Sequence, residues 1–335
     1  MEIEQRDRER TEDVFEHVVE PPSIDPYMAM HLVRNDDGSL TRLPLFPTCP
    51  PVGQVEHPTA RCFSKDVISD LNHNVRLRIY RPNPVPSETK LPILIFFHGG
   101  GFICFSPATA GYHVYAEEMA CRLPAIVISV DYRLAPENPL PAAYDDAFDT
   151  VEWVRDEWAQ EPWVRDYGDV SRCFLVGSSA GGNIVYHTAL RTQKIDLGPV
   201  VIEGLIFIQP FFGGVLRTDS ELRFANDMIL PLPVTDLMWE LSLPSGSQRD
   251  HVFCNPMTGT PSAEEMGNLP RSLVSSNLGD PLNDRQRDFA KMLEEKGVKV
   301  VTQFREGHHA AELLDAGAME ALVKDVKSFV SGFCK

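Results

Sequence analysis

Gly177-Ser178-Ser179-Ala180-Gly181 is the stretch of this sequence that decides the fold, because of the segments on either side of it. The apolar run 173–176 before it predicts a strand, and residues 182–191 after it indicate a helix. A serine in such a turn lies on strained backbone, and the flanking glycines let strand and helix approach closely, which leaves its hydroxyl exposed. We therefore predict that Ser179 is a nucleophile. Ser178 is the off-register alternative, but it lacks glycines at the required spacing.

A second glycine-rich segment supports this prediction. His98-Gly99-Gly100-Gly101-Phe102 follows the apolar run 93–97 and lies upstream of the serine. Adjacent glycines expose successive backbone N–H groups, which stabilise the charged oxygen of an acyl-transfer intermediate. We assign the oxyanion hole to Gly99, Gly100, Gly101 and Ala180, with the N–H groups of the last three as the expected donors. A tight glycine turn without chemistry is the alternative.

The C-terminal part of the chain supplies an acid after the serine, as this arrangement requires. Residues 273–276 predict a strand that runs into Gly279-Asp280-Pro281, so Asp280 lies in a loop at the end of that strand. Asp284 is an alternative acid. It lies in the first turn of an expected helix, where an acidic residue is more simply a partner of the helix dipole.

The base follows the acid. Residues 298–304 predict the next strand, and His308 and His309 come directly after it. Both loops then lie at the same sheet edge as Ser179. The two histidines are adjacent, so their side chains point in different directions and only one of them can reach the serine.

Four segments together resemble a known family: HGGGF at 98–102, DYRLAPE at 131–137, GSSAGGN at 177–183 and GDP at 279–281. They are similar to the plant carboxylesterases, in the hormone-sensitive-lipase-like (GDXG) branch of the α/β-hydrolases. The resemblance extends from about residue 25 to the C-terminus. It implies an α/β fold with a mostly parallel central sheet flanked by helices, and a cap formed by an N-terminal region and an inserted region.

The resemblance also assigns roles. It selects Asp280 and His309 as the partners of Ser179 in a catalytic triad, and it gives His98 a supporting role in the oxyanion loop without proton transfer. Segment 131–137 is interpreted as scaffold in which an arginine and acidic residues fix the loops.

The implied activity is serine carboxylesterase: hydrolysis, through an acyl-enzyme, of a small-molecule carboxylic ester, including lactone, hormone or specialised-metabolite esters. A dehydratase or cyclase of a plant metabolite on the same scaffold is the alternative. A non-hydrolytic receptor is less favoured, because the related gibberellin receptors lack the catalytic histidine that is present here.

Hydrophobic periodicity predicts one α/β domain over residues 24–335, preceded by a mobile extension at 1–23. The cap is expected at 24–60, with a short helix at 26–33 and a turn at 35–38, and at 211–261. Strands are expected at 75–80, 93–97, 126–130, 173–176, 205–209, 273–276 and 298–304, and helices at 112–122, 142–156, 182–191, 285–296 and 319–329.

A substrate pocket is expected where the cap meets the sheet edge. Its predicted lining residues are Tyr27, Met28, Phe102, Phe212, Trp239 and Leu243, with His31 and Met228 nearby. Packing of the aromatic and methionine side chains between cap and sheet is the alternative interpretation.

Composition excludes several functions. The formal charge of −17 on 335 residues disfavours nucleic acid and anionic membranes as partners, and we expect no membrane insertion because no apolar run is long enough. Seven scattered cysteines indicate free thiols in a reducing compartment, so we expect a cytoplasmic protein. No metal or other cofactor is expected, because no cluster has metal-ligand spacing. The sequence indicates no oligomeric state.

Overall fold

The computed structural model describes residues 24–332 apart from residues 45, 70–71, 87–88 and 260. The predicted mobile extension 1–23 lies outside the described residues. An eight-stranded sheet runs through the centre in the order β10-β9-β8-β7-β5-β6-β4-β3. Its strands are β3 (Cys62–Ile68), β4 (Arg76–Pro82), β5 (Leu91–Phe97), β6 (Ile126–Asp131), β7 (Gly168–Ser178), β8 (Ile202–Ile208), β9 (Arg271–Asn277) and β10 (Val300–Arg305).

The sheet is parallel from β6 to β10, and β3 and β4 form an antiparallel edge. Parallel strands are buried on both faces, as β5 illustrates. Ile93, Ile95 and Phe97 point into one hydrophobic core, whereas Leu94 and Phe96 point into the other. This two-faced, mostly parallel sheet confirms the predicted α/β fold class.

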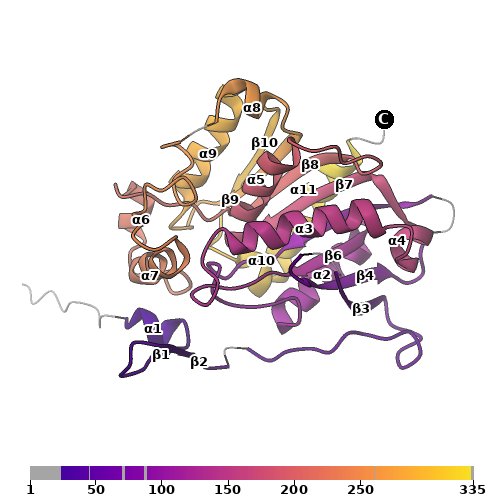
Figure 1. The fold of residues 1–335 in the computed structure, drawn as a ribbon, viewed down its shortest axis with the longest axis horizontal. Helices are drawn as coiled ribbons and strands as arrows, with labels where there is room; N and C mark the ends of the chain where they lie inside the picture. Colours follow the sequence, from indigo (N-terminus) through magenta and orange to yellow (C-terminus); the bar gives the residue numbers. More distant parts are fainter. Residues whose placement is uncertain (1–23, 45, 70–71, 87–88, 260, 333–335) are drawn as a thin grey trace, which may run out of the picture.

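Helices cover both faces of the sheet (Figure 1). The first core contains buried residues of α3 (Ala142–Glu157), α5 (Ala180–Thr192) and α9 (Asn283–Glu295). The second core contains buried residues of α2 (Ala110–Arg122) and α11 (Ala316–Ser331). Each of these five helices overlaps one of the predicted helices.

All seven predicted strands are present, with ends that differ by a few residues. β7 begins at Gly168, five residues before the predicted start at 173. β3 is not among the predicted strands. It lies at the edge of the sheet, where the polar run Ser64-Lys65-Asp66 interrupts the apolar residues, and this interruption weakens the apolar signal of a buried strand.

The N-terminal segment differs from the prediction of one helix at 26–33. α1 (Pro26–Ala29) is a single turn capped by Asp25, and His31 has a left-handed φ of 52° that ends it. β1 (Leu32–Arg34) then pairs with β2 (Leu40–Arg42) across the predicted turn at 35–38. Pairing with a neighbouring strand therefore overrides the helical pattern in the second half of this segment.

The insertion between β8 and β9 carries α6 (Asp219–Arg223), α7 (Leu232–Ser242) and α8 (Ala263–Gly267). α1 packs against α7, so the two regions expected to form a cap meet over the same end of the molecule (Figure 1). Short helices also occur at α4 (Pro162–Tyr167) and α10 (Ala311–Leu314). Within the described part of the chain, no helix has both the length and the apolar character that crossing a bilayer demands.

Candidate active site

Ser179 lies between the end of β7 and the start of α5, as predicted. Its backbone has φ 53° and ψ −117°, a conformation that non-glycine residues rarely adopt. The flanking glycines make this turn possible. A Cβ on Gly177 would lie 2.1 Å from the carbonyl oxygen of Gly181, and a Cβ on Gly181 would lie 2.0 Å from that of Phe97. Strand and helix thus approach more closely than side chains would allow.

His309 meets Ser179 at the carboxyl edge of the sheet. Its Nε2 lies 3.1 Å from the Ser179 Oγ, and its Nδ1 lies 2.8 Å from Oδ2 of Asp280. A carboxylate can only accept, so Nδ1 carries the proton and Nε2 is free to accept one from the serine. The neighbouring His308 turns away, and its Nδ1 bonds to the carbonyl oxygen of His309 at 2.8 Å. The structure therefore brings His309 to the serine.

Asp280 is fully buried in the loop after β9. Its Oδ1 accepts from the backbone N–H of Leu282 at 2.8 Å, and its Oδ2 accepts from Nε2 of Gln286 at 3.0 Å as well as from His309. These bonds hold the carboxylate in one orientation, which in turn orients the imidazole ring.

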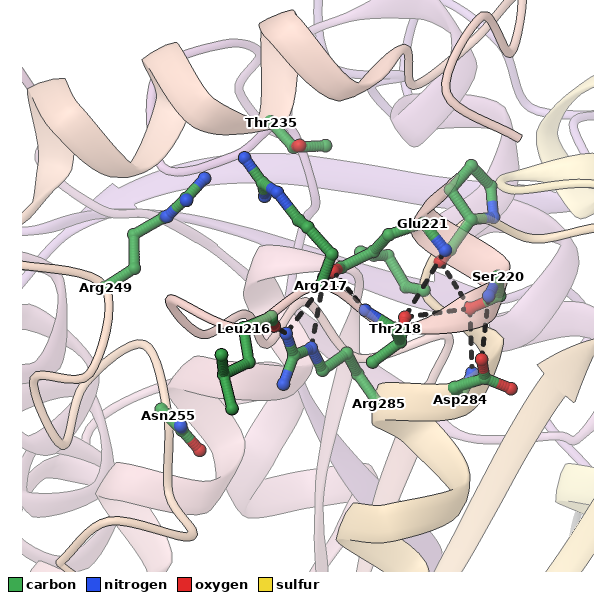
Figure 2. Close-up of polar contacts among 12 residues, drawn as sticks. Leu216, Arg217, Thr218, Ser220, Glu221, Thr235, Arg249, Asn255, Asp284 and Arg285 are labelled. Atoms are coloured by element: carbon green, nitrogen blue, oxygen red, sulfur yellow. Dashed lines mark hydrogen bonds and ion pairs between the residues drawn. The ribbon is translucent and has the colours of Figure 1, made fainter. Parts of the chain in front are cut away.

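The alternative acid, Asp284, has a different place. It lies in the first turn of α9, and its Oδ2 accepts from the backbone N–H of Ser220 at 2.7 Å (Figure 2). Ser220 in turn donates its hydroxyl to the carbonyl of Pro281 at 2.8 Å. Ser220 therefore connects α6 of the insertion to two places. One is Asp284 at the N-terminus of α9, and the other is the loop that carries Asp280.

Opposing effects act on the His309 pKa. Burial by itself disfavours the imidazolium form, but the charge of Asp280 and the hydrogen bond to it favour that form, with smaller contributions from Glu312 and Asp227. The net effect raises the pKa of His309 above its ordinary value. A raised pKa makes the imidazole a stronger base towards the serine hydroxyl.

The glycine loop places two of its residues in the cavity that Ser179 also lines. Gly100 and Gly101 line the same cavity as Ser179 and have φ angles of 105° and 62°, which favour glycine. Ala180 is the first residue of α5, so its N–H has no partner within the helix. Gly99 was assigned to the oxyanion loop but not as one of its donors, and its N–H donates to the hydroxyl of Tyr112 at 2.9 Å inside the protein.

His98 is completely buried beneath this loop. Its Nδ1 lies 2.8 Å from the carbonyl oxygen of Gly99, and its ring stacks on Tyr132 with centroids 4.3 Å apart. Burial lowers the pKa of His98 to about 4, so the ring is neutral at physiological pH. The ring thus contacts the loop from below, and its supporting role stays the prediction that the family resemblance implies.

Segment 131–137 ties loops together through arginine and acidic side chains. Arg133 binds the buried Asp146 of α3, with its guanidinium Nη2 2.8 Å from Oδ1 of the aspartate. Glu137 accepts from Nε of Arg42 at 2.8 Å, and Arg42 belongs to β2 of the N-terminal region. The segment thus joins the cap to the main sheet.

A cavity of about 360 Å³ opens beside Ser179 and His309. Its described lining residues carry no carboxylate, ammonium or guanidinium group. Besides Ser179, His309 and the glycine loop, they are Ile24, Ala29, Met30, Phe46, Cys104, Phe105, Tyr112, Met228, Ile229, Leu230, Pro231, Val234, Met238, Ala310, Leu313 and Leu314.

The predicted pocket residues differ from this lining. Tyr27, Met28, Phe102, Phe212, Trp239 and Leu243 are not among the described residues that line the cavity. Four of them are buried in the main core, and Met28 is 61% exposed. On α7, Val234 and Met238 face the cavity, whereas Trp239 stacks on Phe211 with centroids 4.5 Å apart. Successive side chains on a helix point about 100° apart. The sequence therefore identified the correct helix, α7, but not the side chains of that helix that face the cavity.

The prediction also missed two buried polar residues near His309, namely Gln209 after β8 and Glu312 in α10. Gln209 donates to Glu312 at 2.7 Å and accepts from the backbone N–H of Ala310 at 2.6 Å. The spacing of Glu312, three residues after the candidate base, was a usable signal. An acidic residue so close to a buried site is rarely buried itself unless it is paired. Among the described residues, no group of histidines, cysteines and acidic residues is arranged to hold a metal ion.

The fold and this arrangement of side chains are those of an α/β-hydrolase, and comparison with known proteins agrees. A family model described as an alpha/beta hydrolase fold matches residues 94–312. Probable carboxylesterase 8 of Arabidopsis thaliana is 47% identical over 321 residues, which cover 92% of this chain and 94% of that protein. The 3-O-acetylpapaveroxine carboxylesterase CXE2 of Papaver somniferum is 49% identical over 280 residues, 80% of this chain and 90% of that protein.

Among solved structures, an esterase of Pyrobaculum calidifontis superposes with a TM-score of 0.69 at 25% identity, covering 81% of this chain and 85% of that chain. The chain therefore belongs to the plant carboxylesterases of the hormone-sensitive-lipase-like branch, and it is a carboxylic ester hydrolase. Both the family and the enzyme class predicted from the sequence are confirmed.

Proposed function

We propose that the enzyme hydrolyses esters through an acyl-enzyme on Ser179. His309 takes the proton of the Ser179 hydroxyl as the oxygen attacks the ester carbonyl, and Asp280 stabilises the imidazolium that forms. The backbone amides of Gly100, Gly101 and Ala180 bind the oxyanion. His309 then protonates the departing alcohol. Water then attacks the acyl-enzyme in the same way, with His309 as the base, and the carboxylic acid is released.

The observation that carries this proposal is the unbroken hydrogen-bonded line from a buried carboxylate to a serine hydroxyl. The two contacts of His309 measure 2.8 Å to Asp280 and 3.1 Å to Ser179, within the range for proton transfer in a resting site. The line ends in the cavity, where a carbonyl carbon can approach the serine.

We infer from the cavity that the substrate is a neutral ester with an apolar acyl or alcohol group. The described lining is dominated by aliphatic, methionine and aromatic side chains, which give a charged group no counter-ion. The Papaver relative is named for an O-acetylated compound, and a small acyl group on a larger apolar alcohol fits this lining. We therefore propose acetyl esters of apolar alcohols as the first compounds to test.

We also propose that the enzyme works in the cytosol. The six described cysteines are free thiols, including the neighbouring Cys62 and Cys121, as expected in a reducing compartment.

The test is the S179A variant with p-nitrophenyl acetate and with an acetate ester of an apolar alcohol. We expect kcat to fall by at least about 10³-fold with the fold unchanged. A fluorophosphonate should label wild-type protein on Ser179 and leave the variant unlabelled. Ester turnover that survives in S179A would rule out the acyl-enzyme. Labelling without ester turnover would instead favour a dehydratase or cyclase activity.

A further inference from the structure

A buried polar network lies beneath the triad and takes no part in the steps described so far. Its centre is Glu312, which is only 6% exposed. One carboxylate oxygen lies 3.3 Å from the hydroxyl of Ser178, the residue before the nucleophile. The other accepts from the side-chain amide of Gln209 at 2.7 Å. The network therefore reaches both the serine turn and the end of β8.

The contacts of Gln209 define the direction of its hydrogen bonds. Its Oε1 lies 2.6 Å from the backbone nitrogen of Ala310. A backbone N–H can only donate, so the amide oxygen must face Ala310 and the NH2 group must face Glu312. Gln209 thus connects the carboxylate to the residue directly after His309.

Tyr112 of α2 lies between this network and the oxyanion loop. Its hydroxyl oxygen accepts from the N–H of Gly99 at 2.9 Å, and Glu312 and Ser178 are neighbours that act on its pKa. Ser178 itself donates its hydroxyl to Glu312. The carboxylate therefore accepts from Ser178 and from Gln209, and it needs no proton of its own to satisfy these two bonds.

Strained backbone lies in and beside this network. Gln209 and Ala310 have φ angles of 46° and 57°, and the neighbouring Ser179 has a φ of 53°. Positive φ angles are unfavourable for non-glycine residues, so surrounding contacts must hold them. Ala310 is the turn between His309 and α10, and its N–H is held by Gln209. Loss of that bond would let the turn relax and move the imidazole.

We propose that Gln209 and Glu312 are positioning residues of this esterase site. Gln209 holds the main chain beside His309, and the Glu312 carboxylate ties that turn to Ser178 while its negative charge favours the imidazolium form of His309. The proposal deepens, and rests on, the proposed function. Neither residue is among the described residues that line the cavity, so both act through others.

The charged and titratable groups around the pair are few. Tyr112 and Tyr115 of α2 face Glu312, and burial raises the pKa of both phenols, so they stay neutral. Burial also raises the pKa of Glu312, whereas His309, Gln209 and Ser178 act to lower it. His309 itself faces Asp280, Glu312 and Asp227. Removal of the Glu312 charge should therefore act mainly on His309.

The first experiment compares E312Q with E161Q. Glu161 is a matched control, because it is a buried glutamate that accepts from a backbone N–H, that of Val164, at the start of α4. The pKa of His309 is measured by NMR titration of its ring nitrogens and from the acid limb of kcat/KM. We expect E312Q to lower this pKa by about 0.5–1 unit and E161Q to leave it unchanged.

Equal His309 pKa values in wild type and E312Q would overturn the role of Glu312. The NMR titration needs no turnover, so it decides this point even if the wild-type protein hydrolyses no ester. Absence of ester hydrolysis would instead overturn the proposed function.

The second experiment tests Gln209. Q209A should lower kcat about 10-fold with little change in KM, because a displaced base slows chemistry more than binding. Glycine adopts the left-handed conformation without strain, so A310G in the Q209A background should restore part of kcat. Unchanged kcat in Q209A, or no rescue by A310G, would refute the positioning role of Gln209.

Discussion

At the scale of single residues, the site depends on atoms that lie closer together than side chains normally permit. Gly181 is the clearest case, because its Cα faces the carbonyl of Phe97 at the end of the neighbouring strand β5. Backbone cannot move aside as a flexible side chain can. The absence of a Cβ is therefore what lets α5 start directly behind the nucleophile.

We predict that G181A loses activity and stability together. The added Cβ would lie 2.0 Å from the Phe97 oxygen, so we expect unfolding to become easier by about 3 kcal/mol or more. G111A is the matched control, since a Cβ there meets no atom within 4 Å. Alanine is the better helix former, so G111A should be neutral or stabilising by up to about 1 kcal/mol. Calorimetry of both variants, with p-nitrophenyl acetate turnover, checks the prediction, which a stable and active G181A would contradict.

A second prediction concerns the charge of Asp280. Protonated His309 cannot accept the serine proton, so kcat/KM must fall as the pH drops through the His309 pKa. Asp280 raises that pKa, so D280N should move the acid limb to lower pH. It should also lower kcat about 10⁴-fold, because an amide does not hold the required tautomer. A pH profile of kcat/KM for both proteins is the measurement, and an acid limb that stays in place would argue against this assignment.

At the scale of elements, the short helix α6 connects the insertion to the catalytic loop. Glu221 and Thr218 form a capping box at its start, and Glu221 also pairs with Arg285 of α9 at 3.0 Å (Figure 2). Ser220 contacts Asp284 and Pro281 from the same turn. An insertion that shapes the cavity is thus fixed to the loop that orients His309.

This arrangement predicts different outcomes for two aspartates only four positions apart. D284A removes the acceptor for the Ser220 N–H, so it should destabilise the protein by about 1–2 kcal/mol and leave most of kcat intact. D280A should instead remove most of kcat. Urea unfolding and steady-state kinetics of the two variants give the comparison. A D284A variant as inactive as D280A would mean that Asp284 takes part in catalysis.

At the scale of the whole molecule, histidine rings that the fold shields from water contribute to how stability depends on pH: His98 is fully buried, and His187 is partly buried with its Nε2 inaccessible. Burial lowers the pKa of His98 to about 4 and that of His187 to about 3. Their unfolded value is 6.5, so below that pH the unfolded chain binds protons that the folded protein does not. The free energy of unfolding therefore falls as the pH drops from 6.5 towards 4, for His98 by about 3 kcal/mol in total. His309 has a raised pKa and acts oppositely, since its contribution is lost as the pH rises.

We predict that H187F reduces this acid sensitivity. Phenylalanine keeps the stacking on Tyr144, where the His187 ring lies with centroids 4.5 Å apart, but it binds no proton in the unfolded chain. The loss of unfolding free energy between pH 7 and pH 5 should shrink by about 2 kcal/mol relative to wild type. Chemical denaturation at the two pH values measures it. Identical losses in both proteins would show that the fold does not keep His187 neutral.

The sequence by itself determined the features that neighbouring residues encode. Gly177 to Gly181 specify the nucleophile turn, and the alternation of apolar runs specifies the order of strands and helices. These features need only local sequence, because a glycine-flanked turn and a strand buried on both faces are each encoded by consecutive residues. The place of Asp280, in a loop at the end of a strand, also followed from the sequence.

Tertiary structure alone decided which atoms from distant segments meet. Local geometry left open which of His308 and His309 reaches Ser179, and only the family resemblance selected His309. The contact itself depends on the left-handed turn at Ala310 that Gln209 holds. The engagement of the Gly99 amide by Tyr112, and the choice of Met238 over Trp239 to face the cavity, likewise depend on how α2 and α7 pack. Such contacts join residues far apart in the chain, and the rotation of a helix is set by the surfaces it packs against rather than by its own sequence.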